Sequence, residues 1–355
     1  MAPRRVGSLH LALAVVAPGR PLREGLDRIV KAKMGALVVV GDGPEVLSIC
    51  SGGFLLDAAY SPQRLSELAK MDGAIILAAD ASRIARANVH LVPNPNVPTS
   101  ETGTRHRTAE RVARSIDVPV ISVSEDMGVI AVYVGGMKHI LEEIPRLLNR
   151  ANQALQTLER YKIRLDDGSA ELSQLEVEDV VSVRDVVAVL QRGEMVRRIA
   201  EELETYIIEL GVDARLIRLQ LDEILGDLED DRWLVIQDYL FDPDIPVDDA
   251  LEELATIDTD DLLDVREVAR VLRLPGHMDL ESNLQPRGYR LLAKVPRLPE
   301  GIIDHVVDRF GSLQKIMRAT LHDLEDVQGV GEVRARAIKD GLSRLAESSI
   351  LDRYS

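Results

Sequence analysis

Apolar and polar positions alternate in two different ways along the first 150 residues. Short runs of apolar or β-branched residues predict strands at 9–17, 36–40, 74–78, 118–123 and 129–134. Between them, residues 23–33 and 62–70 have the apolar spacing of helices. An Asp-Gly pair, Asp42-Gly43, separates the run that ends at Val40 from the run 46–50, which predicts a hairpin turn. Residues 1–146 are therefore expected to form an α/β domain with a mixed sheet.

From residue 147 the spacing becomes helical and stays so to about residue 272. The clearest series, at intervals of three and four, is Val196, Ile199, Leu203, Ile207 and Leu210. A stretch with two prolines and two glycines, 275–288, then predicts a linker. We expect an all-α middle domain over residues 147–285 and a small C-terminal domain over residues 286–355.

The distribution of charge changes the picture of the middle domain. The formal net charge of the 355 residues is -16, and it divides into +3 over residues 1–150, -19 over 151–290 and 0 over 291–355. The acidity therefore belongs to the helices. We interpret it as the solvated surface of a helical spacer, and an acidic binding site is the alternative.

Composition excludes several classes of protein. Aromatic residues make up 3% of the chain, which argues against a protein that binds single-stranded nucleic acid by stacking its bases on aromatic side chains. Cys50 is the only cysteine, so disulfides within the chain and Cys-based zinc sites are excluded. No apolar run has the length of a membrane span, and no Gly-x-Gly-x-x-Gly or Walker-type loop is present. We expect a cytoplasmic protein with no membrane partner.

The first motif that could carry chemistry is Asp72-Gly73-Ala74, directly before the apolar run 75–77. It places a carboxylate at the start of a strand, and the glycine lets a ligand approach the backbone. A string of three common residues is weak by itself, so a solvated turn is an equally good interpretation.

The second motif places two arginines, a histidine and two threonines where a helix begins. Its residues are Gly103, Thr104, Arg105, His106, Arg107 and Thr108. Unpaired backbone N–H groups and the helix dipole favour an anion at such a point, and arginine offers forked donors to phosphate oxygens. The alternative is a capped helix with a solvated basic turn. Cations at a helix N-terminus oppose the dipole, however, so the motif favours a polyphosphate site.

Ser124 and Glu125 follow the strand predicted at 118–123, where α/β sheets often place ligand groups. Asp72 and Glu125 are therefore candidate oxygen ligands for Mg²⁺ or Mn²⁺, which prefer carboxylates together with substrate phosphates. An acidic surface turn is the alternative for Glu125. Leu91 opens a Pro-rich stretch, 91–98, that is expected to be an ordered loop near the site.

The C-terminal domain contains two predicted helices joined by a Gly-Val-Gly turn. This pattern resembles a helix-hairpin-helix, which points backbone N–H groups at DNA phosphates without identifying bases. The residues that the resemblance implies in contact with DNA are Gly329, Val330, Gly331, Arg334, Arg336 and Lys339. Residues 294–299 could form a degenerate partner hairpin, with prolines in place of the glycines. A helical hairpin used for packing or protein contact is the alternative.

Taken in order, these motifs resemble the DNA-integrity scanning diadenylate cyclase (DisA) family over the whole chain. The resemblance implies a nucleotidyltransferase that condenses two ATP molecules into cyclic di-AMP and two pyrophosphates. It also implies cyclase domains that face each other in a homo-octamer, and DNA, in particular branched DNA, as the partner of the C-terminal domain. The alternative is a non-catalytic scaffold that senses a nucleotide and binds DNA.

The resemblance also implies roles for single residues. Asp72 would hold the metal and assist loss of the 3′-hydroxyl proton, and Gly73 and Leu91 would contact the nucleotide through their main chain. Residues 103–108 would hold the triphosphate and neutralise the departing pyrophosphate. Ser124 would be a further phosphate contact.

Overall fold

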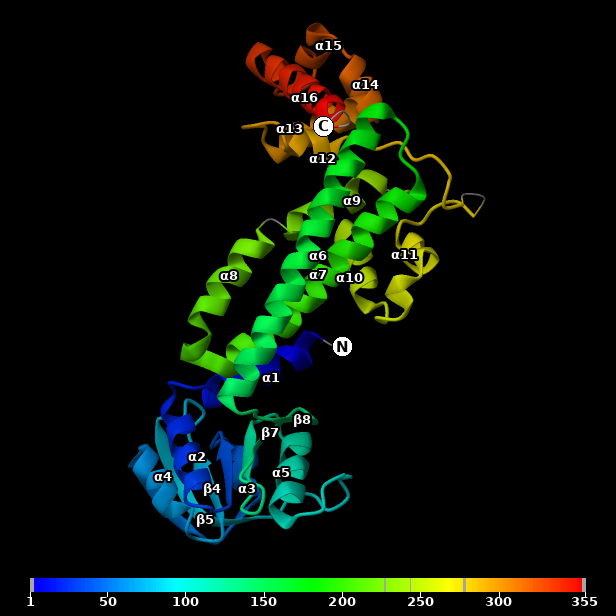
Figure 1. Ribbon diagram of the computed structural model, residues 1–355. Helices are drawn as coiled ribbons and strands as arrows, with labels where there is room; N and C mark the ends of the chain where they lie inside the picture. Colours follow the sequence, from blue (N-terminus) through cyan, green and yellow to red (C-terminus); the bar gives the residue numbers. More distant parts are fainter. Residues whose placement is uncertain (1–2, 227, 243, 277–278, 353–355) are drawn as a thin grey trace. The chain divides into compact units, whose positions relative to one another are not determined.

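The computed structural model describes residues 3–226, 228–242, 244–276 and 279–352. Its contacts divide the chain into two compact units (Figure 1). Unit 1 comprises Met1–Leu155 and Glu202–Gln220, and unit 2 comprises Gln156–Glu201 and Leu221–Ser355. Two long helices, α6 (Ile144–Glu178) and α7 (Val183–Leu210), contribute residues to both units. The domain boundaries expected after residues 146 and 285 divide the chain into consecutive segments, unlike units 1 and 2, and they stay predictions.

Unit 1 is built on a mixed sheet, as the sequence predicts. Within the described residues the sheet has eight strands, in the order β2-β5-β4-β1-β6-β7-β8, and β3 also pairs with β5. Only the β1–β4 pairing is parallel among these described strands. The strands are β1 (Ala36–Val40), β2 (Cys50–Ser51), β3 (Phe54–Ala59), β4 (Ala74–Leu77), β5 (Arg83–Leu91), β6 (Val120–Val123), β7 (Ile130–Val134) and β8 (Met137–Ile140).

Helices cover both faces of this sheet. On one face lie α1 (Pro3–Val16), α2 (Pro21–Lys31) and α4 (Pro62–Leu68), and on the other lie α3 (Pro44–Ser48) and α5 (Thr104–Ser115) (Figure 1). Successive strand residues therefore enter different cores, because side chains alternate across a sheet. Val38 belongs to the core under α1 and α2, whereas Val39 belongs to the core under α5.

Two expectations for unit 1 are wrong. Residues 9–17 lie mostly in helix α1, where Leu13 and Val16 are fully buried against the sheet, and do not form a strand. The run 46–50 lies mostly in the short helix α3, which begins at Pro44, a residue whose fixed φ suits the first turn of a helix. Strand β1 consequently pairs with β4 and β6 rather than with a hairpin partner.

The remaining elements expected in unit 1 are confirmed. The strands predicted at 36–40, 74–78, 118–123 and 129–134 are β1, β4, β6 and β7, and the helices predicted at 23–33 and 62–70 are α2 and α4. Strands β3, β5 and β8 were not expected. In β5, arginine, asparagine and histidine interrupt the apolar positions, which hides the alternation.

Unit 2 is helical, as expected. Besides parts of α6 and α7, its described helices are α8 (Arg215–Leu225, shared with unit 1), α9 (Leu228–Tyr239), α10 (Val247–Thr256), α11 (Val265–Val271), α12 (Tyr289–Ala293), α13 (Glu300–Phe310), α14 (Leu313–Arg318), α15 (Leu321–Glu325) and α16 (Glu332–Asp352). None of the helices in the described ranges combines the length and the apolarity that crossing a membrane requires.

The last part of unit 2 contains two similar helix–turn–helix segments. Helices α12 and α13 flank the turn 294–299, and α15 and α16 flank the turn 326–331. Arg297 (φ 62°) and Gly329 (φ 83°) occupy the same position in the two turns and share the left-handed conformation. Val295 and Val327 are both buried two residues earlier. The first turn therefore repeats the backbone of the second, although it has prolines where the second has glycine and glutamine.

A buried carboxylate fixes the start of α12. The Asp238 side chain accepts hydrogen bonds from the backbone N–H groups of Gly288, Tyr289 and Arg290. Burial, reinforced by the nearby Glu176 carboxylate, raises the pKa of Asp238 to about 7. The Arg290 guanidinium donates to Glu176 at 2.6 Å. These contacts attach the first turn segment to α6 and α9 inside unit 2.

Candidate functional site

One pocket of about 560 Å³ in unit 1 brings together almost all the residues that the sequence singles out there. The site residues predicted from the sequence that line this pocket are Asp72, Gly73, Ala74, Leu91, Gly103, Thr104, Arg105, His106, Thr108, Ser124 and Glu125. They come from the start of β4, the end of β5, the start of α5 and the turn after β6. Arg107 is exposed and is not among the lining residues. The two halves of the predicted site, 72–74 and 103–108, therefore face one cavity.

Glycine is required at position 73 by the neighbouring strand. A Cβ atom there would lie 2.5 Å from the backbone Cα and carbonyl carbon of Asn88 in β5, closer than real Cβ contacts occur. Asn88 itself has φ 53°, at an irregular part of the β4–β5 pairing. The neighbouring Asp72 side chain is 91% exposed and lines the pocket.

The Arg105 guanidinium lies between two carboxylates. Its Nη2 is 2.8 Å from Asp72 Oδ1, and its Nη1 is 3.7 Å from Glu125 Oε2. The group also rests on Gly35, where a Cβ would lie 2.1 Å from Nη1. Nothing in the sequence pattern indicated Gly35. The arrangement places oxygen atoms of Asp72 and Glu125 on opposite sides of one cationic group.

These two carboxylates fit the requirements of Mg²⁺ or Mn²⁺ better than those of a metal with an all-protein cage. Mg²⁺ is commonly held by one or two carboxylates, with phosphate oxygens and waters completing the shell. Both carboxylates contact the Arg105 guanidinium, Asp72 at Nη2 and Glu125 at Nη1. Within the described ranges there is no group of three or more His, Cys, Asp and Glu side chains suited to a metal.

The first turn of α5 adds hydrogen-bond donors to the same pocket. Gly103 occupies the N-cap position without a side-chain cap, and no acidic residue lies in the first turn. The backbone N–H groups of the first turn have no partner within the helix, so they are available to an anion. Thr108 Oγ1 donates to the Thr104 carbonyl, which orients its hydroxyl along the helix.

His106 is held from behind by residues that the sequence analysis missed. Its Nδ1 is 3.0 Å from the Tyr133 hydroxyl, which donates to Glu101 Oε1 at 3.2 Å. Lys138 pairs with the same Glu101 oxygen at 2.5 Å. Burial lowers the pKa of His106 below its usual value; the charges of Lys138 and Arg105 act in the same direction, and Glu101 opposes them. The sequence contains one indication of these contacts, a tyrosine within an apolar strand, because a buried tyrosine hydroxyl needs a hydrogen-bond partner.

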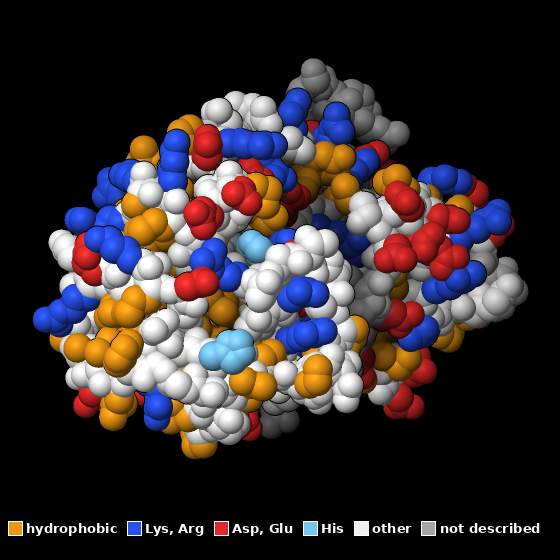
Figure 2. Space-filling view, turned by 90° about the horizontal axis from the view of Figure 1, so that it is seen from below, with side chains coloured by type: hydrophobic (Ala, Val, Ile, Leu, Met, Phe, Trp, Pro, Cys, Tyr) orange, Lys and Arg blue, Asp and Glu red, His pale blue; other side chains and the backbone are white. Residues whose placement is uncertain are grey.

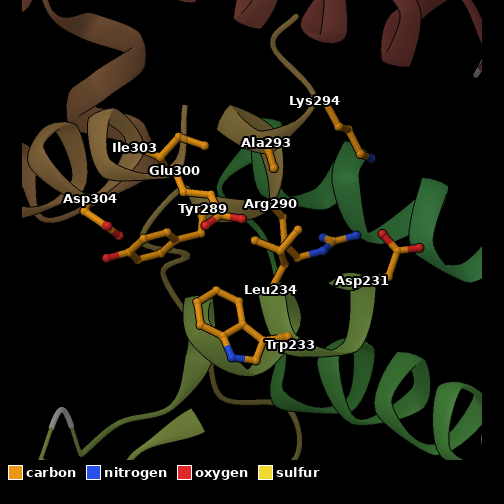
Figure 3. A pocket seen from close by; sticks show the side chains of 10 residues that line it. All are labelled: Asp231, Trp233, Leu234, Tyr289, Arg290, Ala293, Lys294, Glu300, Ile303 and Asp304. Carbon is orange, nitrogen blue, oxygen red and sulfur yellow. The ribbon is translucent and has the colours of Figure 1, made fainter. Parts of the chain in front are cut away.

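A second pocket, of about 580 Å³, lies in unit 2 (Figure 3). Its lining residues are Asp231, Trp233, Leu234, Tyr289, Arg290, Ala293, Lys294, Glu300, Ile303 and Asp304. Three of them are carboxylates, Lys294 is a cation, and Arg290 pairs with buried Glu176. The lining of the pocket in unit 1 also has three carboxylates, Asp72, Glu125 and Asp126, so the balance of charge does not separate the two pockets. The open N-terminus of α5 makes the pocket in unit 1 the better site for a triphosphate.

Comparison with known proteins agrees with this assignment of the two parts of the chain. Residues 23–138 match the family model described as DisA bacterial checkpoint controller nucleotide-binding, and residues 141–281 match the one described as DisA bacterial checkpoint controller linker region. The DNA integrity scanning protein DisA of Parafrankia sp. (strain EAN1pec) is 55% identical over 350 residues, covering 96% of each chain. The chain belongs to the DisA family.

A more distant relative supports the same conclusion. The DNA integrity scanning protein DisA of Streptomyces coelicolor is 53% identical over 353 residues, which cover 98% of this chain and 94% of that protein. The pocket around Asp72 and Arg105 lies in the part that matches the nucleotide-binding model of the DisA family. The similarity to whole DisA proteins extends past residue 281, so it includes the C-terminal turn segments.

In this DisA-family chain the C-terminal turn depends on Gly329 rather than on Gly331. Gly329 has φ 83°, and a Cβ there would lie 2.6 Å from Ile302 Cδ1 of α13. Gly331 has open space within 4 Å of its Cβ position. Val330, between them, is buried and anchors the turn to the helical core.

The three cations expected to contact DNA have different surroundings. Arg334 donates to the Gly329 carbonyl at 2.6 Å, and Arg336 pairs with Glu332 at 2.6 Å. The Lys339 ammonium donates to the carbonyl oxygens of Met317 and Ala319. Lys339 therefore stabilises the C-terminal end of α14, and its charge is already used within the fold.

Proposed function

We propose that the chain is a diadenylate cyclase that condenses two ATP molecules into cyclic di-AMP and two pyrophosphates, and that its C-terminal turns bind DNA. The observation that carries the catalytic part is the convergence of Asp72, Arg105 and the first turn of α5 on one pocket. A carboxylate for the attacking hydroxyl and donors for a triphosphate are thereby placed within one cavity.

The pocket's own residues divide the binding of ATP between them. The N–H groups that open α5, the Arg105 guanidinium and the Ser124 hydroxyl hold the triphosphate. Gly73, directly before β4, and Leu91, at the end of the adjacent strand β5, contact the nucleoside through their main chain. Arg107 is assigned to phosphate binding by resemblance alone, because it lies outside the pocket lining.

In the reaction the 3′-oxygen of one ATP attacks the α-phosphorus of the other. The new bond joins O3′ to Pα, the bond from Pα to the bridging oxygen of pyrophosphate breaks, and the hydroxyl proton is lost. In this proposal Asp72 receives the proton or orients the hydroxyl. Arg105 and the α5 amides stabilise the negative charge on the departing pyrophosphate. Mg²⁺ or Mn²⁺, held by Asp72 and Glu125, would supply further charge neutralisation on the phosphates.

Formation of a ring from two ATP molecules requires two such pockets to face each other. One pocket cannot align two attacks related by a twofold axis, whereas two copies paired by that axis can. Figure 2 shows hydrophobic side chains, in orange, among the charged ones on the face that it views. In unit 1, Phe54, Leu55 and Met127 are more than half exposed. The homo-octamer that the resemblance implies is part of this proposal.

The DNA-binding part of the proposal rests on the paired turns of unit 2. The left-handed turn at Gly329 leads into α16, and the N–H groups of such a turn suit a phosphate. Arg334 and Arg336 lie within the first two turns of that helix. This mode of binding recognises backbone shape, which agrees with branched DNA as the partner.

Mass spectrometry of purified protein incubated with ATP and either Mg²⁺ or Mn²⁺ tests the reaction. A cyclic dinucleotide released together with pyrophosphate is the expected result. The alternative, a nucleotide-sensing DNA-binding scaffold, predicts that ATP binds and is recovered unchanged. That outcome in the intact oligomer, with both metals tried, would remove the catalytic proposal and leave the binding site.

A further inference from the structure

We propose that His106 binds the nucleotide's phosphates only as an imidazolium, so that each nucleotide bound takes up a proton, and that Tyr133 is the positioning residue responsible. The inference rests on the proposed function, because it concerns the same pocket. It assigns a role to the Tyr133–Glu101–Lys138 chain, which the catalytic proposal leaves unused.

The hydrogen bonds of Tyr133 determine which nitrogen of His106 carries a proton. Tyr133 is fully buried in β7, and its hydroxyl lies between Glu101 Oε1 and His106 Nδ1. An ionised carboxylate only accepts hydrogen bonds, so the hydroxyl hydrogen points to Glu101. The hydroxyl oxygen must then accept from His106, which places a hydrogen on Nδ1. Lys138 pairs with the same Glu101 oxygen and holds it in position.

The other nitrogen of the ring therefore begins without a hydrogen. In neutral His106, with Nδ1 protonated, Nε2 carries a lone pair and is an acceptor. Phosphate oxygens are acceptors too, so a neutral ring would face them with the wrong group. His106 lines the pocket at the first turn of α5, where the phosphates are proposed to bind. The ring can donate to them only after Nε2 gains a proton.

The surroundings of His106 favour the neutral ring until an anion arrives. Burial is the largest cause of its lowered pKa, and Arg105 on α5 and Lys138 on β8 add to it. Glu101, from the loop before α5, is the charged group that acts in the opposite direction. A triphosphate next to the ring reverses the balance, because several negative charges favour the imidazolium. Binding and protonation are then linked.

The sign of this linkage is fixed. A group whose pKa is higher in the complex than in the free protein strengthens binding as the pH falls. Burial holds the pKa of His106 in the free protein below that of an ordinary histidine. Nucleotide affinity should therefore be highest below this pKa and should decrease as the pH rises from it through the pKa in the complex. Between the two values binding should consume about one proton per site.

Calorimetric titration with α,β-methylene-ATP and Mg²⁺ tests the inference, because this probe binds without being cleaved between the α- and β-phosphates. At pH 7.5, the heat of binding is measured in buffers of different ionisation enthalpy, and its slope gives the number of protons taken up. Tyr133→Phe keeps the buried ring but frees Nδ1, so that neutral His106 can present Nε2–H instead. We expect uptake of about one proton in the natural protein and much less in this variant.

His106→Asn is the matched second variant, because its side-chain amide cannot titrate and should also lose the uptake. A slope of zero in the natural protein, or an unchanged slope in both variants, would overturn the inference. Failure of the probe to bind at all would instead count against the nucleotide site itself. The number of protons taken up distinguishes a positioning role of Tyr133 from a packing role, because a loss of stability alone does not change that number.

Discussion

Replacing Gly35 by alanine tests whether the position of the Arg105 guanidinium sets the affinity for nucleotide. A Cβ at position 35 would lie 2.1 Å from Nη1 and 2.8 Å from Cζ of Arg105, where ordinary contacts begin near 3.4 Å. The guanidinium must therefore move by about 1 Å or more. Because the atoms that collide with this Cβ are the end of the flexible Arg105 side chain, the backbone next to β1 does not need to shift.

The size of the effect follows from what Arg105 contributes. A charge-assisted hydrogen bond is worth about 1.5–3 kcal/mol, and misplacement of a positioning group by 1 Å can reduce the rate about 100-fold. The ion pairs that Arg105 makes with Asp72 and Glu125 are partly exposed and contribute about 0–1 kcal/mol, so their loss offsets little. We expect nucleotide affinity to fall roughly 10- to 100-fold. The free energy of unfolding should change by less than about 0.5 kcal/mol.

The measurement is the dissociation constant of α,β-methylene-ATP, with urea unfolding as the check on stability. Gly43→Ala is the matched control, because nothing lies within 4 Å of a Cβ there. Equal affinities for the natural protein and Gly35→Ala, with Arg105→Ala weakening binding, would show that the guanidinium moves freely in the complex. The argument from its position in the free protein would then be refuted.

Three further predictions concern separate parts of the chain. Asp72→Asn should abolish cyclic dinucleotide in a mass-spectrometric assay while ATP affinity stays within a few-fold, because the amide keeps the size but loses the charge; full activity would exclude Asp72 from the reaction. Gly329→Val should weaken gel-shift binding of branched and duplex DNA at least about tenfold, through the strained φ and the clash with Ile302, whereas Gly331→Ala should not; equal binding would remove the turn from the interface. The pKa of Asp238 is raised from 3.8 to about 7, so its contribution to stability is complete below about pH 4 and is lost as the pH rises through 7. Asp238→Asn should therefore flatten the pH dependence of urea unfolding between pH 5 and 8, measured by the fluorescence of the single tryptophan, which lies in the same unit. An unchanged profile would count against this titration.

Local chemistry explains what could be predicted about the fold. Residues 36–40 and 120–123 are short apolar runs fully buried in a sheet, and no other element suits them as well. Residues 9–17 are also apolar, but their length fits a helix and a strand equally, and periodicity alone does not separate the two. Only the packing of Leu13 and Val16 against the sheet decides for a helix.

The candidate site likewise has residues that the local sequence predicts and residues that it does not. Asp72 and the motif at 103–108 could be found because each places its chemistry within a few consecutive residues. Gly35, Tyr133 and Lys138 act through contacts with residues about 30 to 70 positions away, which no local pattern records. Arg105 and Arg107 were equivalent in the sequence, yet a helix turns by about 100° per residue, so only one of them lines the pocket.

The order in which a ribosome makes the chain differs from the order in which unit 1 is completed. Glu209, 3% exposed, accepts the Glu142 backbone N–H and pairs with His139 Nε2 at 2.6 Å. Val212 fills the space beside Gly19. All five residues belong to unit 1, but the segment 202–220 is synthesised only after residues 156–201, which belong to unit 2. A fragment ending near Arg150 would thus expose a surface that is normally covered, whereas a fragment that joins residues 1–155 to 202–220 through a short loop would keep this surface covered.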